Sequence, residues 1–393
     1  MDTGLYMKNE TDFERALRIK GYGSFDKKNS KLKVDKEIRV DNSLTVKPTV
    51  ITSVSEYVNF INGLKGNSSL NPIFFRGHEN ADYLLTPNCL RINPENEHLI
   101  LEEFERHFPN EFNSNMIAME KLSLMQHFYL PTRALDISEN PLMALYFACS
   151  HMKKFRTRIL RPEDEKWGEI VLFQEPKEKE EKKSEKLKTI ESSNISIIAN
   201  TAFMENDFSL WHLGSKWKRD VDWGHNEKYI DLTTIVHNSF IVRVPFLNPR
   251  IKNQQGAFIM VNANYVIDEN DELDCDLTNY ILDKEYINYD DLLKSKFSKR
   301  FSPEKTWELK FRKVVPYDTK NKIPIFITDP FNLRRIFYRD EKNVQQVVLI
   351  PPEKKPDILK ELKKFNITED FVYPDMDSVA NEIKERFSNA EDD

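Results

Sequence analysis

An α+β fold is expected for this chain of 393 residues, on three observations. Runs rich in β-branched and aromatic residues, typical of strands, occur beside apolar runs with the spacing of one helix face. The two kinds of run follow one another without the regular alternation that a doubly wound parallel sheet requires. Hydrophobic residues make up 39% of the chain, which is enough for one elaborated domain or two.

The first helix of the folded part is expected directly after Ser53. Ser53 and Glu56 have the spacing of a capping box, and Val54, Tyr57 and Ile61 then recur on one helical face. Glycine and serine between residues 63 and 69 end this pattern. The other runs of the first part are extended at 73–76 and helical at 13–19, 99–108 and 116–125.

The second part begins with a corner at Pro131-Thr132-Arg133, a short strand, and an apolar helix that opens at Asn140-Pro141. A run of alternating Lys and Glu over 175–188 is expected to be a solvated insertion without a chemical role. The remaining expected elements are strands at 168–173, 240–244, 257–261 and 347–350, and helices at 357–365 and 377–387.

These elements predict three regions. Residues 1–45 are charged and weakly periodic, so we expect an N-terminal arm. Residues 46–262 form the core, with a charged insertion near 175–191. Residues 263–393 form a C-terminal elaboration that packs on the core.

Composition excludes several classes of protein. The formal net charge of -6 is small for this length, so no global field attracts nucleic acid or a membrane. Cys89, Cys149 and Cys275 are odd in number and widely spaced, which is typical of buried thiols in a reducing compartment rather than a disulfide framework. No apolar signal core and no run of membrane-span length occurs. We therefore expect a cytoplasmic protein without a membrane partner, and no metal site or nuclease, since no ligand cluster has suitable spacing.

Polar groups are concentrated where apolar runs end. His127, Arg133 and Asp136 lie within the apolar sequence of 116–152, and Arg76-Gly77-His78 follows the apolar run that ends at Phe75. Burying ionisable groups is costly unless they are paired or used, so these points are candidates for a functional site.

The same residues carry a resemblance to a known family. Phe75-Arg76-Gly77, Gln126-His127, Pro131-Thr132-Arg133, Asp136, Ser138 and the run Asn140-Pro141 to Ala148 resemble the blocks of the FRG-domain family. Asn248-Pro249-Arg250-Ile251 with Gln254-Gln255-Gly256 resembles its third block, and Tyr373-Pro374-Asp375 a fainter tail. The order of the blocks also resembles, more distantly, the ADP-ribosyltransferase superfamily, which implies a mixed-sheet core with helical elaborations.

The superfamily resemblance implies NAD as a substrate. Arg76 would anchor its ribose or phosphates, Gly77 would allow close approach, and Ser138 and Tyr146 would line the nicotinamide side. His127 and Arg133 are further candidates for binding it. Asp136 and Gln255 would lie around the ribose as catalytic groups, with Asp136 supplying the negative charge because residues 252–256 contain no Glu.

Each candidate also has a structural interpretation, which the sequence leaves open. Arg133 and Asp136 can form a buried ion pair, and Arg76 can pair structurally with Asp136. His127 fits a helix end, and Tyr146 fits core packing. Ser138 fits a turn or cap, and the amides of Gln254 and Gln255 can bond neighbouring strands.

Two functions remain on this evidence. The first is an ADP-ribosyltransferase that modifies a macromolecule and acts as an intracellular toxin or phage-defence effector, which implies a neutralising antitoxin protein. Basic and aromatic residues interleave over 294–313, which makes RNA or DNA a candidate acceptor, although an amphipathic helix explains the same pattern. The second is a non-catalytic module that binds a nucleotide or nucleic acid and signals to a partner.

Overall fold

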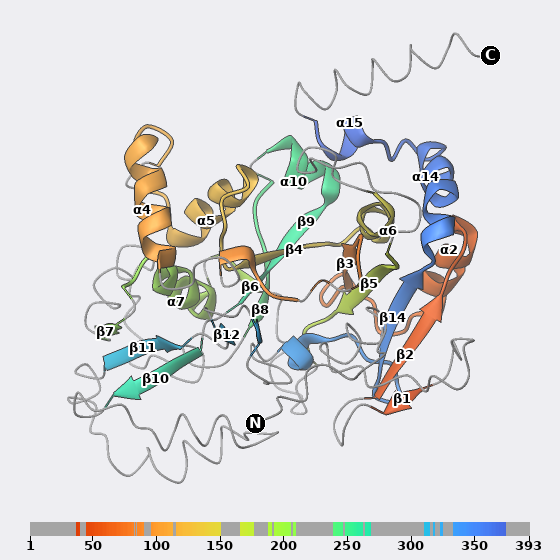
Figure 1. Ribbon diagram of the computed structural model, residues 1–393, viewed down its shortest axis with the longest axis horizontal. Coiled ribbons are helices and arrows are strands. Elements are labelled where there is room, and N and C mark those ends of the chain that lie inside the picture. The colour runs from red at the N-terminus through yellow and green to blue at the C-terminus, as the bar shows by residue number, and fades with distance from the viewer. Residues whose placement is uncertain are drawn as a thin grey trace.

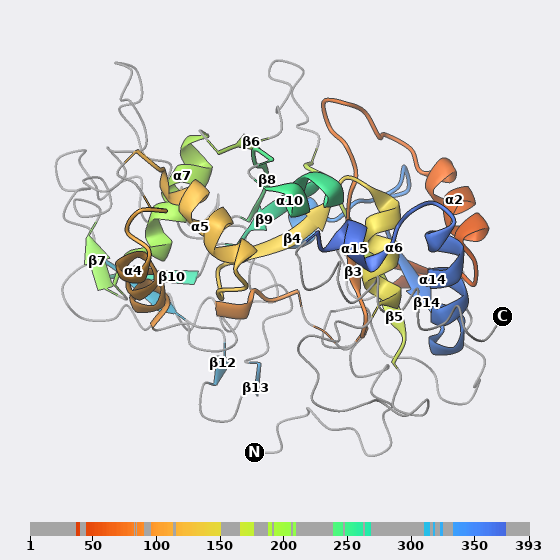
Figure 2. The ribbon, with the colours of Figure 1, turned by 90° about the horizontal axis from the view of Figure 1, so that it is seen from above.

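The chain is described by a computed structural model, drawn in Figures 1 and 2. The residues that the structure describes are 37–39, 45–81, 83, 85–89, 96–112, 115–150, 166–176, 188–190, 192–205, 207–209, 239–246, 248–261, 264–268, 310–314, 317–318, 323–324 and 333–374.

A large mixed sheet forms the framework of the molecule. In the described part of the chain it has nine strands, in the order β1 (Ile38–Arg39), β2 (Thr45–Val50), β14 (Val344–Ile350), β5 (Gly168–Phe173), β3 (Phe74–His78), β4 (Ala134–Ser138), β9 (Gly256–Met260), β8 (Phe240–Arg243) and β6 (Lys188–Thr189). The β2–β14 and β6–β8 pairs are parallel and the others antiparallel. Mixed pairing without βαβ repetition agrees with the expected mixture of helices and strands.

Two smaller sheets accompany this framework. The first has the order β10 (Asn264–Asp268), β11 (Lys310–Val314), β7 (Asp207–Ser209), and the second pairs β12 (Tyr317–Asp318) with β13 (Ile323–Pro324).

The helices follow one another across the large sheet, as Figure 2 shows from α7 to α2. They are α2 (Val54–Gly63), α4 (Glu97–His107), α5 (Ala118–His127), α6 (Pro141–Cys149), α7 (Ser193–Ala202), α10 (Pro249–Gln254), α14 (Lys355–Lys363) and α15 (Glu369–Val372), with 3-10 turns η5 (Leu333–Ile336) and η6 (Pro352–Lys354). None of the described helices is long and apolar enough to cross a membrane.

Local signals in the sequence account for the helix starts. Ser53 caps α2 by accepting from the backbone N–H of Glu56 at 3.2 Å, while the Glu56 carboxylate accepts from Thr52 N at 2.7 Å. Asn140 caps α6 through Leu142 N at 3.0 Å, with Pro141 in the first turn. Each cap satisfies a backbone donor that the helix itself leaves without a partner.

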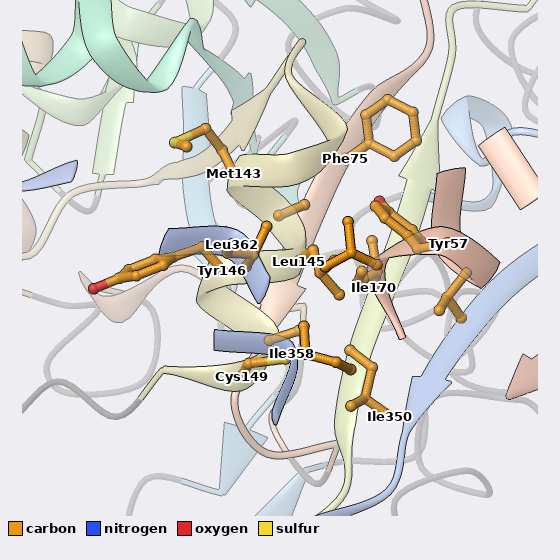
Figure 3. Packing of buried hydrophobic residues seen from close by; sticks show 14 of the residues in the cluster. Tyr57, Phe75, Met143, Leu145, Tyr146, Cys149, Ile170, Ile350, Ile358 and Leu362 are labelled. Carbon is orange, nitrogen blue, oxygen red and sulfur yellow. The ribbon is translucent and has the colours of Figure 1, made fainter. Parts of the chain in front are cut away.

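Among the described residues, buried side chains form a cluster on each half of the large sheet. The first joins β3, β5 and β14 to α2, α6 and α14, and Figure 3 shows part of it, including Tyr57, Phe75 and Ile170. The second joins β4, β8 and β9 to α5, α7 and α10. The boundary between the two clusters coincides with the boundary between β3 and β4.

Helix α6 lies unusually close to the sheet. A Cβ built on Gly77 would be 2.0 Å from the carbonyl oxygen of Ala144, and one on Gly168 would be 2.4 Å from that of Ala148. The close approach therefore needs glycine on β3 and β5 and small residues on α6. The missing side chain of Gly77 thus admits the backbone of α6. A ligand contact at Gly77 stays a prediction.

Most of the expected elements are present, with boundaries moved by one to three residues. The pattern did not indicate β2, α7 or the short helices α10 and α15. The expected elements at 13–19 and 377–387, most of the Lys/Glu run and most of the segment 294–313 lie outside the described residues. Residues 310–313 of that segment belong to the strand β11 and not to a helix.

The expected division into three regions differs from the sheet topology. β14, from the expected C-terminal elaboration, lies inside the large sheet between β2 and β5, and β1, from the expected arm, pairs with β2. All seven residues of β14 are buried, and a strand that is buried on both faces needs a neighbour on each side. Residues far apart in the sequence therefore share one core.

Replacing Gly77 by Ala should destabilise the protein by about 3 kcal/mol or leave it unfolded, because the new methyl group overlaps the α6 backbone. Gly63→Ala is the matched control: a Cβ at this position meets nothing within 4 Å, so stability should stay the same or rise slightly. Urea unfolding followed by circular dichroism measures both. Equal midpoints for Gly77→Ala and wild type would contradict the close packing.

Candidate functional site

The large sheet divides at the boundary between β3 and β4. β3 pairs with β5 over five positions, and β4 with β9 over five, but β3 and β4 share only one, Phe75 opposite Ser138. Beyond this position the strands separate, and Figure 1 shows β4 running away from β3 towards β9. Ligand sites are common where two packed units meet, so this junction is the first place to look for one.

Arg76 directly follows Phe75, the residue of β3 that pairs with β4. Its Nη1 donates to the backbone carbonyl of Asp136 on β4, and its Nε donates to His78 Nε2 at 2.9 Å. The guanidinium thus bridges the two strands where their backbone pairing has ended. The expected alternative, a pairing of Arg76 with Asp136, is present through the carbonyl oxygen and not through the carboxylate.

Asp136 presents an exposed carboxylate beside this bridge. Gln126 Nε2, at the end of α5, donates to Asp136 Oδ2 at 3.1 Å, and the Thr132 hydroxyl donates to Gln126 Oε1. Three polar residues of the sequence block at 126–136 therefore bond one another. This chain orients the carboxylate without burying it.

Arg250 and two tyrosines extend the arrangement. The guanidinium of Arg250, on α10, lies 4.6 Å from the ring centre of Tyr129 and 5.4 Å from that of Tyr373. Burial raises the pKa of the Tyr373 hydroxyl well above its ordinary value; Arg250 opposes this rise, and Tyr129, Asp136 and Glu369 add to it. Asp136 and Arg250 therefore both lie within electrostatic reach of Tyr373.

We call these residues the junction cluster. Its members are Arg76, Gln126, Tyr129, Asp136, Arg250 and Tyr373. It holds two guanidinium groups, one exposed carboxylate, one amide and two phenol rings. Such a set suits a ligand with anionic phosphates, hydroxyl groups and an aromatic ring. Tyr129 also has a left-handed backbone (φ 61°), which is uncommon outside glycine and is enriched at functional sites.

Arg133, an expected binding residue, is buried away from this arrangement. Its guanidinium donates to both carboxylate oxygens of Glu97, with Nε 2.9 Å from Oε1, and to Thr201 Oγ1 at 2.7 Å. The alternative that Arg133 pairs with Asp136 is wrong, because its carboxylate partner is Glu97 on α4. Arg133 ties α4 and α7 to the start of β4.

Ser138 and Gln255 lie at the other end of β4. The buried Ser138 hydroxyl donates to the carbonyl of Gln254 at 2.6 Å and accepts from Asn140 N at 2.9 Å. Gln255 is exposed and ends α10 with a left-handed backbone (φ 46°), while its carbonyl accepts from Glu139 N at 3.0 Å. These bonds match the structural interpretation of Ser138; a ligand role for either residue stays a prediction.

The two remaining expected residues lie at the edge of the first core and at the end of α5. Tyr146 is buried in α6, and Figure 3 shows its hydroxyl directed away from Tyr57 and Phe75. His127 is half-buried, with its ring 5.0 Å from that of Phe128. Both positions agree with the structural interpretations.

The sequence block around residues 248–256 is linked to the C-terminal tail. Gln254 Nε2 donates to the carbonyl of Val372 at 3.0 Å, and Asn253 Nδ2 to that of Phe371 at 2.8 Å. The amide of Gln254 thus bonds α15 and not a neighbouring strand. These two bonds hold Tyr373 against Arg250.

Sequence reasoning quoted Gln126, Arg250 and Tyr373 within motifs but did not select them as site residues. Each of them lies beside a selected residue or within a family block, so the family blocks are the sequence feature that indicates these three residues. Tyr129 has no such signal, because its role depends on a backbone conformation.

Other chemistry is disfavoured in the described residues. Burial raises the pKa of the Cys149 thiol to about 12, with Lys355 opposing the rise, so this cysteine is not a thiolate nucleophile. Cys89 is buried as well, and Cys275 lies outside the described residues. No group of three or more His, Cys, Asp or Glu residues that could hold a metal ion occurs in the part of the chain that was searched.

Comparison with known proteins identifies a similar domain. The FRG-domain model matches residues 71–157, so this part of the chain is similar to the FRG domain. The matched interval contains Arg76, Gln126 and Asp136 but ends before Arg250 and Tyr373. No curated protein and no solved structure matches the chain.

Replacing Arg133 by Met should cost about 3–5 kcal/mol of stability, because it leaves the charge of Glu97 buried without its partner. Adding Glu97→Leu should recover much of this loss, since both charges are then removed. Arg106→Met is the control: Arg106 is exposed and bonded to exposed Glu103, so its loss should leave stability unchanged. Chemical unfolding of wild type, these three variants and the single variant Glu97→Leu tests this, and additive losses at Arg133 and Glu97 would contradict it.

Proposed function

We propose that this FRG-domain protein is an ADP-ribosyltransferase that uses NAD as its substrate and the junction cluster as its site. The observation that carries the proposal is the bridge at the β3–β4 boundary. There the Arg76 guanidinium, from one half of the sheet, donates to the backbone carbonyl of Asp136 in the other half, and the carboxylate of Asp136 is exposed. The ADP-ribosyltransferase-like core belongs to this proposal and rests on the order of the sequence blocks.

The two guanidinium groups suit the anionic part of NAD. Arg76 offers a planar fork for pyrophosphate or ribose hydroxyls, and its orientation is set by two hydrogen bonds. Arg250 is held by stacking between two phenol rings. Both cations are therefore largely ordered before a ligand arrives, which lowers the entropy cost of binding.

The carboxylate of Asp136 suits the transfer step. Breaking the bond between ribose C1′ and the nicotinamide nitrogen sends the electron pair to nicotinamide and leaves positive charge on the ribose. Asp136 would stabilise that charge, and Gln126 keeps its carboxylate oriented. The acceptor nucleophile then forms its bond to C1′ and loses a proton. Contacts of Gln255 with the ribose and of Tyr146 with the nicotinamide remain part of this proposal.

The biological setting rests on the family resemblance alone. It comprises a cytoplasmic toxin or phage-defence effector, a neutralising antitoxin protein, and a protein, RNA or DNA acceptor. Most of the residues at 294–313 that favoured nucleic acid lie outside the described part, and 310–313 belong to the strand β11.

A non-catalytic binding module is the second candidate. One observation favours it: position 255, where the superfamily pattern has a Glu, carries an amide. An amide can bond a ribose hydroxyl but supplies no formal charge. On this alternative the cluster binds a nucleotide and Asp136 only selects it.

Labelled NAD incubated with separate pools of protein, RNA and DNA tests the proposal. Wild type should transfer label to one pool, Arg76→Ala should abolish transfer, and Asp136→Asn should lower it about 10²-fold or more by removing the charge. The Asp136→Asn fold should be intact, because the carboxylate is exposed. Asp357→Asn and Arg106→Met, both exposed surface changes, should leave transfer unchanged.

Two outcomes would redirect the proposal. If folded wild type neither transfers label nor releases nicotinamide but binds NAD through Arg76, the protein is a binding module. Full transfer by Asp136→Asn would remove Asp136 from the chemistry. If Arg76→Ala is unfolded, Arg76→Lys retains a cation and separates anchoring from folding.

A further inference from the structure

A chain of three ionisable groups lies behind the junction cluster. Arg76 Nε donates to His78 Nε2 at 2.9 Å, and His78 Nδ1 lies 3.0 Å from Oε2 of Glu169 on β5. His78 is 4% exposed and Glu169 0%. His78 and Glu169 stand directly opposite each other in the β3–β5 register, so their side chains leave the sheet on the same face.

The protons in this chain can be assigned. An arginine Nε always carries hydrogen, so it can only donate, and His78 Nε2 must accept. The imidazole proton is then on Nδ1 and is donated to the Glu169 carboxylate. Both ring nitrogens have a partner only when His78 is neutral with this tautomer, because an imidazolium has no acceptor to offer Arg76.

We infer that His78 and Glu169 are positioning residues that aim the Arg76 guanidinium at the β3–β4 junction, and that a proton on His78 releases it. The inference rests on the proposed function in one respect, that Arg76 is the ligand anchor. Neither residue touches the ligand. They act through Arg76, as an outer carboxylate and histidine orient a group in many active sites.

The direction of the pH effect follows from the neighbouring charges. Glu169 favours the imidazolium, and Arg76 opposes it. Lys355 on α14 also opposes it, since its Nζ donates to the carbonyl of Glu79, the residue after His78. Tyr83 contributes an aromatic edge 6.3 Å from the His78 ring, and its hydroxyl bonds the Glu79 carboxylate. As the pH falls, His78 gains a proton at Nε2, the bond to Arg76 is lost, and ligand affinity should fall.

A measurement without ligand tests the coupling. Nitrogen-15 NMR of the imidazoles distinguishes the two neutral tautomers, and the signal lost in His78→Gln assigns His78 among the eight histidines of the chain. Wild type should show neutral His78 protonated on Nδ1. Arg76→Met should raise the pH of its titration midpoint by about one unit or more, because a nearby cation is removed. Glu169→Gln should lower the midpoint, and Arg106→Met should not change it.

An Nε2-protonated tautomer, or a midpoint unchanged in Arg76→Met, would overturn the inference whether or not NAD binds. These variants retain side chains of similar size, and a thermal melt confirms that each is folded. The test is therefore independent of the proposed function.

A second measurement connects the titration of His78 to the binding of NAD. The affinity of wild type for NAD should fall about tenfold per pH unit below the His78 midpoint. His78→Gln should keep the affinity at neutral pH and lose this dependence, because its amide can accept from Arg76 and has no titration. A wild-type profile shared by His78→Gln would reject the role of His78. Absence of NAD binding at every pH would reject the proposed function, while the NMR titration still decides the coupling.

Discussion

The contact between α6 and the glycines of β3 and β5 sets the geometry of the whole region. Gly77 and Gly168 let the backbone of α6 pack directly against the sheet, so α6 has little freedom to shift. Alternate residues of a strand point to opposite faces. With Phe75 and Gly77 facing α6, Arg76 and His78 must face the other way, where Glu169 is the cross-strand neighbour of His78. The Gly of the family tripeptide thus fixes where its Arg points.

The separation of β3 from β4 is the second constraint. Arg76 starts on the face opposite α6, and Asp136, two residues before Ser138, shares the face of Phe75. A continuous ladder would keep these side chains on opposite sides of the sheet. Because pairing stops after one position, the guanidinium reaches the Asp136 carbonyl from the other side. The two hydrophobic clusters stabilise the two halves separately, so this opening costs the core little.

Helices and strands could be predicted well from the sequence, but the partners of the buried charged side chains could not. Capping at Ser53 and Asn140 and the period of the apolar runs are local, so α2, α5 and α6 could be located from the chain alone. The partner of Arg133 is 36 residues away and that of His78 is 91 away. The pattern of apolar residues indicates that a polar side chain is buried, but not which carboxylate it pairs with. Asp136 is the nearest carboxylate to Arg133 in sequence, yet it points out of the core. Glu97 begins a helix that packs against the core. The inner place of β14 was missed for the same reason.

The order of charges in the junction cluster bears on the kind of ligand. A purely polyanionic ligand would gain from Arg76 and Arg250 but meet repulsion from Asp136, which is exposed beside them. NAD carries a pyrophosphate and a cationic nicotinamide ring, and the positive charge moves from that ring to the ribose as the ring leaves. The two guanidinium groups complement the pyrophosphate and the Asp136 carboxylate complements the positive charge, and complementarity to the developing charge counts most because it is realised in the transition state. The Asp136 carboxylate would repel the phosphates of a nucleic acid bound as the primary ligand. The same carboxylate makes NAD the better fit for the site, and nucleic acid remains a candidate acceptor.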